Sequence, residues 1–334
     1  MISRVADSIY WMSRYLERAE NIARFIDVNL HLTLDLRFEV VSDQWLSLVS
    51  TSGDSKDFEK RYKTSSEEDI IYFLTFDRKN PNSIASCISA ARENARSIRD
   101  TISSEMWEQI NRFYLLIQKN NKMNKIKNLQ EFFYQIKMAN HLFIGLTEST
   151  MSHEEAWHFA QLGKFIERAD KTARILDVKY YLLLPNSEFI NSSYDAVQWA
   201  ALLKSTSAFE MYRKKFHKIS YKNVADFLIL DPSFPRSIHH CVLQALTSIR
   251  AISRYTKTES PALTDLASLH QVLCHDDIHN ILETGLHEFI DKFQIKLNEI
   301  DQEIKTSFIE TSPTIPKNES DDGEENILKK QTES

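Results

Sequence analysis

The residues of this chain best suited to chemistry are charged side chains that recur at one spacing in two places. Glu17, Glu20 and Arg24 follow one another at steps of three and four residues, which places them on one flank of a helix. The same pattern returns 150 residues later, as Glu167, Asp170 and Arg174. An exposed acid–base pair four residues apart stabilises a protein by only about 0.2 to 1 kcal/mol. Surface stability alone is therefore a weak explanation for the recurrence.

Two uses of these charges are compatible with the sequence. If Glu17 and Glu167 converge in a cleft between the two segments, their carboxylates together with Arg24 and Arg174 could bind a polar ligand or a divalent cation. Interhelical ion pairs that fix how two helices pack would retain the same residues for a structural reason.

A pair of histidines near the end of the chain is the second candidate. His275 and His279 lie four residues apart, a spacing that can hold a transition metal on one helix face, and Glu283 extends that face. The order His-Asp-x-x-His resembles a metalloprotease helix in which Asp replaces the base Glu, and the shorter Asp would lie farther from a metal-bound water. Ordinary surface histidines explain the pair equally well. We therefore assign no metal ligand and no cofactor from the sequence.

The remaining motifs carry less information. Glu155 and His158 match the Glu-x-x-His element of di-iron bundles once, whereas such a site needs two of these elements. Residues 213–218 interleave basic and aromatic side chains, but a solvated helix face has the same composition, and the net charge of -6 gives no support for nucleic acid. A Gly-x-Ser-x-Gly nucleophile motif is missing. The sequence thus identifies no catalytic residue and leaves open whether the protein is an enzyme.

The elements that must position the recurring charges occur twice. Residues 16–28 match residues 166–178 at an offset of 150, and residues 73–84 match residues 227–238 at an offset of 154. Single residues matched at the larger offset are Trp45 with Trp199, Cys87 with Cys241 and Arg96 with Arg250. A four-residue insertion in the second copy accounts for the difference in offset. Three matching blocks in one order indicate an internal duplication.

Composition predicts an all-α fold. The chain of 334 residues contains 5 Gly and 7 Pro, whereas an average chain of this length has about 23 Gly. Glycine-rich phosphate-binding loops are therefore a poor interpretation. Apolar residues in 5–26 and in 159–176 step by threes and fours, as in a helical bundle. These apolar residues form a stripe, or seam, along one face of each predicted helix, and alanines at successive positions of the seam, such as Ala19 and Ala23, permit another helix to approach closely. We therefore expect these two helices to pack against each other or against equivalent partners.

Boundaries follow from the same patterns. We predict one helical repeat in residues 1–150, a second in residues 151–310 that shares its core with the first, and a disordered acidic tail in residues 311–334. Pro81 and Pro235 each precede a long helical run, which marks a helix start. The charged residues 51–69 are expected to form a solvated connection, and two helical stretches are expected between Ala262 and Phe308.

Targeting signals and membrane segments are not predicted. Charged residues interrupt the first twenty positions, and no run approaches the eighteen apolar residues of a membrane helix. The spacing of the three cysteines, Cys87, Cys241 and Cys274, does not indicate a disulfide framework. We expect them to be small buried residues in a reducing compartment. The expected location is the cytoplasm.

Several ordered motifs resemble the bacterial alpha-E domain family. The resemblance begins with residues 3–24 and continues through residues 91–96, Trp107-Glu108, residues 145–170 and residues 285–289. It covers about residues 1–308, which is nearly the whole chain apart from the tail.

This resemblance implies an all-helical bacterial protein, commonly encoded beside or fused to ATP-grasp ligase-like and transglutaminase-like proteins. It implies a binding or accessory role in ATP-dependent peptide ligation or peptide modification, with an ATP-grasp ligase-like partner acting in trans and a transglutaminase-like protein as a second candidate partner. A metal-dependent amide hydrolase that uses converging carboxylates, or a purely structural homo-oligomer, are the alternatives. By motif, the ligand- or partner-binding residues are expected to be Glu17, Arg18, Glu20, Arg24, Arg92, Glu93, Asn94, Arg96, Glu167, Arg168, Asp170 and Arg174.

Overall fold

The computed structural model describes residues 1–34, 38–120, 126–183 and 193–310, and it is helical throughout. The described residues form 15 α-helices with one closing π-helical turn, and they contain no strand. The all-α prediction is therefore confirmed. The predicted acidic tail lies outside the described residues, and the duplication itself stays a prediction.

The helices of the first half are α1 (Ser3–Leu34), α2 (Phe38–Ser52), α3 (Ser55–Arg61), α4 (Glu67–Thr75), α5 (Ile84–Ser97), α6 (Ser104–Lys119) and α7 (Leu129–Thr150). Those of the second half are α8 (Glu155–Leu183), α9 (Ser193–Ser205), α10 (Phe209–Lys215), α11 (Tyr221–Leu230), α12 (Ile238–Thr256), α13 (Pro261–His275), α14 (Ile278–Thr284) and α15 (Leu286–Ile304).

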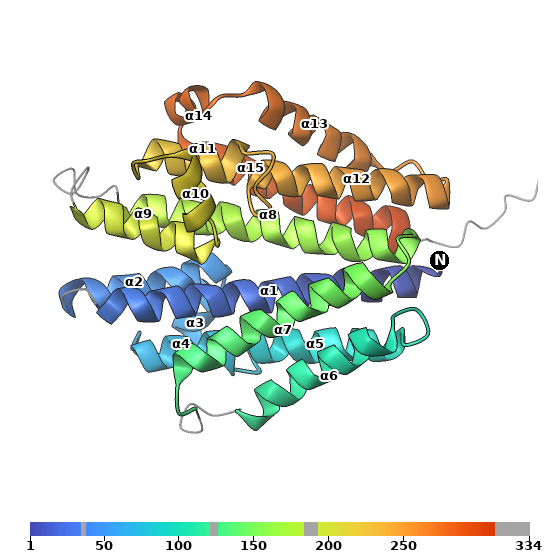
Figure 1. The fold of residues 1–334 in the computed structure, drawn as a ribbon, viewed down its shortest axis with the longest axis horizontal. Helices are drawn as coiled ribbons and strands as arrows, with labels where there is room; N and C mark the ends of the chain where they lie inside the picture. Colours follow the sequence, from blue (N-terminus) through green and yellow to red (C-terminus); the bar gives the residue numbers. More distant parts are fainter. Residues whose placement is uncertain (35–37, 121–125, 184–192, 311–334) are drawn as a thin grey trace, which may run out of the picture.

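The long helices α1 and α8 lie side by side through the middle of the bundle (Figure 1). Small buried residues line their contact, among them Ala19 and Ala23 of α1 and Ala169 of α8. The two helices approach closely at Gly163, where an added Cβ would stand 2.4 Å from the carbonyl oxygen of Tyr10. The close pairing predicted from the seam alanines is confirmed.

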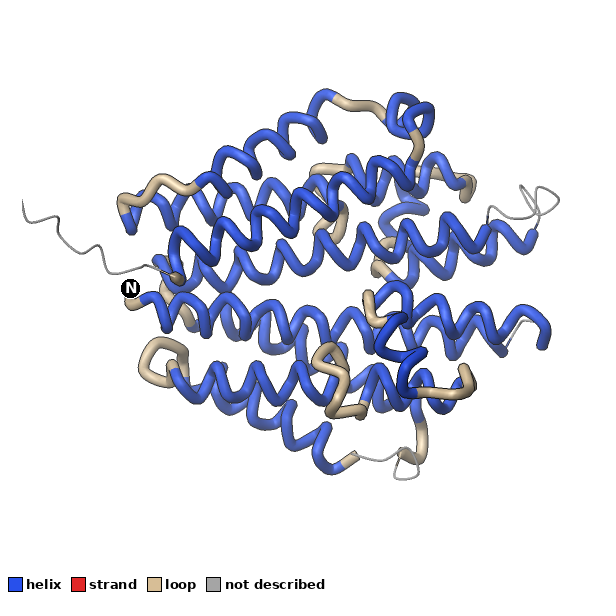
Figure 2. Tube along the Cα trace, turned by 180° about the vertical axis from the view of Figure 1, so that it is seen from behind, coloured by secondary structure: helices blue, strands red, loops and turns tan. Residues whose placement is uncertain are grey.

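The other helices cover this central pair from both sides. Helices α5 and α7 pack on α1, whereas α12 and α15 pack on α8. In Figure 1, α5, α6 and α7 lie on one side of the pair and α12, α13 and α15 on the other, and the view from behind in Figure 2 shows the same arrangement. Buried apolar residues from both halves form one continuous cluster.

Two matching helix starts place polar residues beside the central pair. The Ser83 hydroxyl accepts a hydrogen bond from the Ser86 backbone at the start of α5, and Ser237 does the same for His240 at the start of α12. Serine at this position satisfies a backbone N–H that the helix leaves unpaired. The helix starts predicted after Pro81 and Pro235 are confirmed. The residues between each proline and its capping serine, Asn82 and Arg236, both form side-chain hydrogen bonds with α1, as described below.

Two sequence expectations differ from the structure. The charged residues 51–69 are not simply a solvated connection, because they contain α3, whose Phe58 is buried against the core. Two helices were expected after Ala262, but there are three, because the helix is interrupted at Asp276 and Asp277, between α13 and α14.

None of the described helices is long and apolar enough to cross a membrane.

Candidate functional site

The recurring Glu-Arg pairs of α1 and α8 bind each other reciprocally. Arg168 donates to both carboxylate oxygens of Glu17, from Nε at 2.7 Å and from Nη2 at 2.9 Å. Arg18 donates in the same way to Glu167, from Nε at 2.6 Å and from Nη2 at 2.9 Å. Two parallel bonds from one guanidinium hold a carboxylate in a fixed orientation. The four residues therefore join the two central helices at fixed register.

A third arginine completes the surroundings of Glu17. Arg236, from the turn before α12, donates to Glu17 at 3.2 Å, to Asn21 at 3.0 Å and to Glu20 at 2.8 Å. Glu20 also pairs with Arg24, one helical turn further along α1. Each of these carboxylates thus has two arginine partners.

The surroundings of Glu167 contain a different set of cations. Arg14 donates from Nε to Glu167 at 3.0 Å and also pairs with Asp301 of α15. Lys171 lies 3.8 Å from Glu167 and 3.2 Å from Asp170. Asp170 in turn accepts from Arg174 at 2.9 Å.

Burial and pairing together decide the charge state of these carboxyl groups. Glu17, Glu20 and Glu167 are 0 to 1% exposed. Burial alone would raise the pKa of Glu20, but Arg236 and Arg24 outweigh it and lower the value to about 2. The pKa of Glu167 is lowered in the same way, because Arg18 and Arg14 outweigh burial, and that of Glu17 is lowered by Arg168 and Arg236. All three are ionised at neutral pH and fully occupied by arginines.

The predicted residues of α5 take part in a separate set of contacts. Arg92 donates to Asn111 of α6 at 2.9 Å and lies over the ring of Tyr114 at 4.6 Å. Glu93 accepts from Arg96, and both of these side chains are exposed. The contacts of Arg92 join α5 to α6, whereas Glu93 and Arg96 pair within α5. None of these contacts involves the Glu-Arg pairs of the central helices. Asn94 of the same predicted group is half-buried on α5.

The predicted histidine face does not form. His275 ends α13 and bonds to the carbonyl of Gln271, whereas His279 lies on α14 beside Lys222 at 2.5 Å. The two aspartates between them end the first helix, and the side chain of Asp277 caps the second. The i,i+4 spacing therefore does not place the two imidazoles on one helix. The burial prediction for the cysteines is also wrong in part, because Cys87 and Cys241 are buried but Cys274 is exposed.

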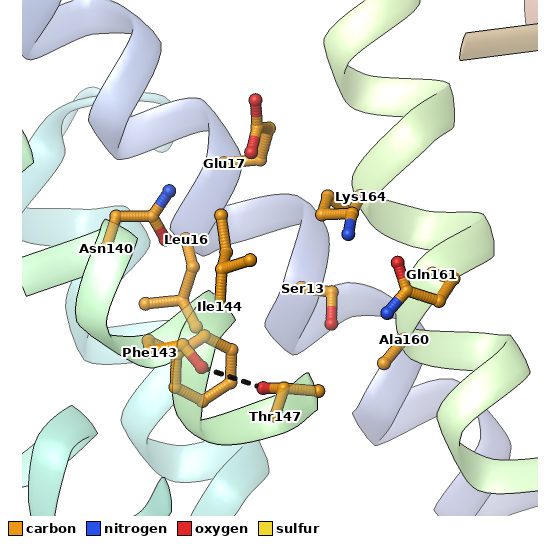
Figure 3. A pocket seen from close by; sticks show the side chains of 10 residues that line it. All are labelled: Ser13, Leu16, Glu17, Asn140, Phe143, Ile144, Thr147, Ala160, Gln161 and Lys164. Atoms are coloured by element: carbon orange, nitrogen blue, oxygen red, sulfur yellow. Dashed lines mark hydrogen bonds between the residues drawn. The ribbon is translucent and has the colours of Figure 1, made fainter. Parts of the chain in front are cut away.

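A small opening lies beside the network, between α1, α7 and α8 (Figure 3). Its volume is about 20 Å³, which is room for one or two atoms of a ligand or for a water molecule. Its lining residues are Ser13, Leu16, Glu17, Asn140, Phe143, Ile144, Thr147, Ala160, Gln161 and Lys164.

Two hydrogen-bond donors at this opening have no acceptor. Asn140 is 1% exposed, and its amide nitrogen has no partner within the described chain. Lys164 forms no ion pair with any described residue and lies over the ring of Phe165 at 4.4 Å. Burial, reinforced by the nearby Arg168, lowers the pKa of Lys164 to about 8. An uncompensated buried donor is costly, so the buried Asn140 amide favours an acceptor from outside the chain, and the half-buried Lys164 beside it would contribute a positive charge.

Sequence reasoning missed Arg14, Lys164 and Arg236. Arg14 and Lys164 are related by the offset of 150, and Arg236 corresponds to Asn82 at the offset of 154. Comparing the two copies position by position would have drawn attention to them, because these are places where a charged or polar side chain is present but its type changes.

Comparison with known proteins agrees with this geometry. A family model described as a predicted alpha-helical domain with a conserved ER motif, where E and R are Glu and Arg, matches residues 1–309. The pairs Glu17-Arg18 and Glu167-Arg168 fit that description.

Relatives are found among uncharacterized proteins of Mycobacterium bovis and of two Mycobacterium tuberculosis strains. Each is 22% identical over 256 residues, a match that covers 70% of this chain but 28% of the relative. The chain therefore spans little more than a quarter of the length of these relatives. No solved structure matches. Since the family model covers nearly the whole described chain, the protein belongs to the Alpha-E family.

Proposed function

We propose that this protein is a cytoplasmic binding component of an ATP-grasp-linked peptide ligation or peptide-modification system, in which it holds a carboxylate-bearing peptide for a partner enzyme. The observation that carries this proposal is the opening lined by Asn140 and Lys164, where, among the described residues, the buried Asn140 amide nitrogen has no acceptor and the half-buried Lys164 ammonium has no ion-pair partner. Enzymes that ligate peptides with ATP act on a carboxylate, so a carboxylate is the chemical group that the partner would need to have presented.

The charge around the opening favours such a group. Glu17 contributes to the lining, but its two oxygens already accept from Arg168 and Arg236. Lys164 forms no ion pair within 4 Å of a described carboxylate, although the charges of Glu17 and Glu148 act on it from farther away. A carboxylate that accepts from Lys164 and Asn140 would form charge-assisted hydrogen bonds, which are about twice as strong as neutral ones.

The size of the opening limits what enters it. A free volume of about 20 Å³ accommodates the end of a carboxylate-bearing group but not an amino-acid residue. The remainder of the peptide would therefore lie outside, within reach of a second protein. The mycobacterial relatives, in which the matching segment occupies 28% of the chain, support a domain that works beside another protein region.

A metal-dependent amide hydrolase has less support. Such an enzyme needs carboxylates that are free to bind metal or to accept a proton. Glu17 and Glu167 are each held by two parallel bonds from one arginine, and their pKa values are lowered by these partners although burial opposes the effect. Neither group is available as a base at neutral pH.

Cross-linking in the source cells tests the proposal. The tagged protein is captured after cross-linking, and the proteins recovered with it are identified by mass spectrometry. We expect an ATP-grasp ligase-like protein among them. Recovery of nothing except this chain would contradict the accessory role and favour a structural homo-oligomer.

Reconstitution then tests the opening itself. The captured ligase is assayed for ATP-dependent peptide modification with the wild-type protein and with Ala160→Tyr, which fills the opening. We expect Ala160→Tyr to lose the stimulation, whereas Lys292→Met, an exposed lysine of α15, retains it. Equal stimulation by all three proteins would show that the opening does not receive the substrate.

A further inference from the structure

Two histidines and a cysteine meet between α12 and α13, outside the Glu-Arg network. His239 lies at the start of α12 and is buried. His270 and Cys274 lie one helical turn apart on α13, half-buried and exposed respectively. One ligand atom from each of the three side chains lies within 4.8 Å of the others.

The distances match those of a metal-binding site. The Cys274 sulfur is 3.6 Å from His239 Nε2 and 3.5 Å from His270 Nε2. A tetrahedral zinc ion with bonds of about 2.3 Å to sulfur and about 2.0 to 2.1 Å to nitrogen separates these two ligand atoms by about 3.5 Å. Both sulfur–nitrogen distances therefore match those that a single bound ion requires, and all three ligand atoms lie within 4.8 Å of one another.

His239 is oriented for metal binding by the backbone. Its Nδ1 lies 3.0 Å from the carbonyl oxygen of Leu230, to which it donates. The proton on Nδ1 leaves the lone pair of Nε2 free and directed at the sulfur of Cys274. Metal-ligating histidines typically use their second nitrogen in this way, which fixes the tautomer and the plane of the ring.

We propose that His239, His270 and Cys274 bind a zinc ion, with a fourth position open to solvent. A thiolate with two imidazoles is a soft ligand set, which excludes magnesium and calcium and suits zinc. Three protein ligands and one open position are typical of zinc sites that bind a water molecule or another small ligand. Because Cys274 is exposed, the open position faces the surface of the bundle.

This site is distinct from the His275 and His279 pair that the sequence suggested. Cys274 precedes His275 directly, but the side chain of His275 bonds to Gln271 and that of His279 contacts Lys222. His279 is therefore a matched control, since it is an exposed histidine near the site that makes no contact with the three proposed ligands.

Metal titration of the whole protein tests the proposal. The protein is first treated with a chelator under reducing conditions and then titrated with zinc against a chromophoric chelator. We expect one zinc ion per chain, with affinity lowered by more than about 100-fold in Cys274→Ser and in His270→Ala and unchanged in His279→Ala. Cobalt in place of zinc is expected to give a thiolate-to-metal charge-transfer band that Cys274→Ser removes.

Protection of the thiol provides a second readout that does not depend on affinity. Bound zinc should prevent alkylation of Cys274 in the wild-type protein and in His279→Ala, but not in His270→Ala. Circular dichroism establishes that each variant is folded. Absence of stoichiometric zinc binding, or zinc binding that survives Cys274→Ser with unchanged affinity, would overturn the proposal.

Discussion

Glu17 and Glu167 each have a cation beside them in addition to the arginine of the reciprocal pair, and the two sites differ in which element of the fold supplies it. Beside Glu17 the cation is Arg236, which extends from the turn before α12, and the neighbouring position on α1 is neutral Asn21. Beside Glu167 the cation is Lys171 on α8 itself, and the equivalent turn position is neutral Asn82, which accepts from Arg18 at 2.6 Å. At these matched positions each pair of acids thus keeps one cation, although the residue that supplies it has changed, and Arg14 adds a further cation beside Glu167. The comparison indicates that charge balance is retained at both places.

The two sides also differ in how completely they are filled. Tyr10 and Arg14 both contact Asp301, and together they occupy the space beside Glu167. At the offset of 150 the corresponding residues beside Glu17 are Ala160 and Lys164, which line the opening. The smaller alanine and the unpaired lysine leave room where tyrosine and a paired arginine fill it. The space beside Glu167 is therefore filled by side chains, whereas the space beside Glu17 contains the opening that we propose as the binding site.

The largest effect is expected from Glu167→Gln. Arg18 and Arg14 would lose the carboxylate that compensates their buried charges. Removing one partner of a buried ion pair costs about 3 to 5 kcal/mol in the free energy of unfolding. Urea unfolding measures this loss, with Glu93→Gln on the exposed face of α5 as a control that stays within about 0.5 kcal/mol. A similar small change in both variants would mean that the reciprocal pairs do not hold the central helices together.

A second pair of variants moves the cation beside Glu17 from the turn before α12 to helix α1. Arg236→Asn removes hydrogen bonds to Glu17 and Glu20, and the expected loss is about 1.5 to 3 kcal/mol. Adding Asn21→Lys creates the arrangement found beside Glu167, so the double variant should recover at least half of the loss. If the double variant is no more stable than Arg236→Asn alone, charge balance is not what the two sides have in common.

Gly163→Ala is expected to have an intermediate effect. Its methyl group would meet the carbonyl oxygen of Tyr10 at 2.4 Å, so α1 and α8 must separate locally. Overpacking of this kind costs about 1 to 3 kcal/mol. Gly145→Ala is the control, because nothing lies within 4 Å of the added methyl group, and it should stabilise α7 by up to about 1 kcal/mol. Equal melting temperatures for the two variants would show that the central helices are not in close contact at Gly163.

The last prediction concerns how the free energy of unfolding falls at acid pH. Glu20 has an ordinary pKa of 4.5 that its arginine partners lower to about 2 in the folded protein, against the opposing influence of burial. The unfolded chain therefore binds a proton first as the pH falls. The stabilising contribution of Glu20 is complete above pH 4.5 and is lost between pH 4.5 and about 2. The free energy of unfolding, measured at several pH values, should decrease less steeply between pH 4.5 and about 2 in Glu20→Gln than in the wild-type protein. An identical decrease in both proteins would contradict the pairing of Glu20 with Arg236 and Arg24.

The sequence predicted more of the fold than of the site. Helix starts were predictable because proline and a capping serine are local signals, as at Ser83 and Ser237. The sequence singled out the Glu-Arg residues by their recurrence, and the packing of α1 against α8 was one of two arrangements that the seam alanines allowed. Whether those charges bind a ligand or each other was not predictable, since it depends on Arg236, which a distant turn brings to Glu17.

The histidine cluster shows the same limit. His239 is remote in sequence from His270 and Cys274, and only the packing of α12 against α13 brings them together. The local spacing of His275 and His279 was misleading, because two aspartates end the helix between them.

Protection of Lys164 by a peptide carboxylate tests the central claim most directly. The protein is labelled with an amine-acylating reagent near pH 8, where the lowered pKa of about 8 makes a large fraction of Lys164 reactive, and labelling is quantified by mass spectrometry. Short acetylated peptides are added with either a free carboxylate or an amide at the C-terminus. We predict that the free acid protects Lys164 and the amide does not, and that Asn140→Leu weakens the protection. Equal labelling of Lys164 in the presence of the two peptides would contradict the account.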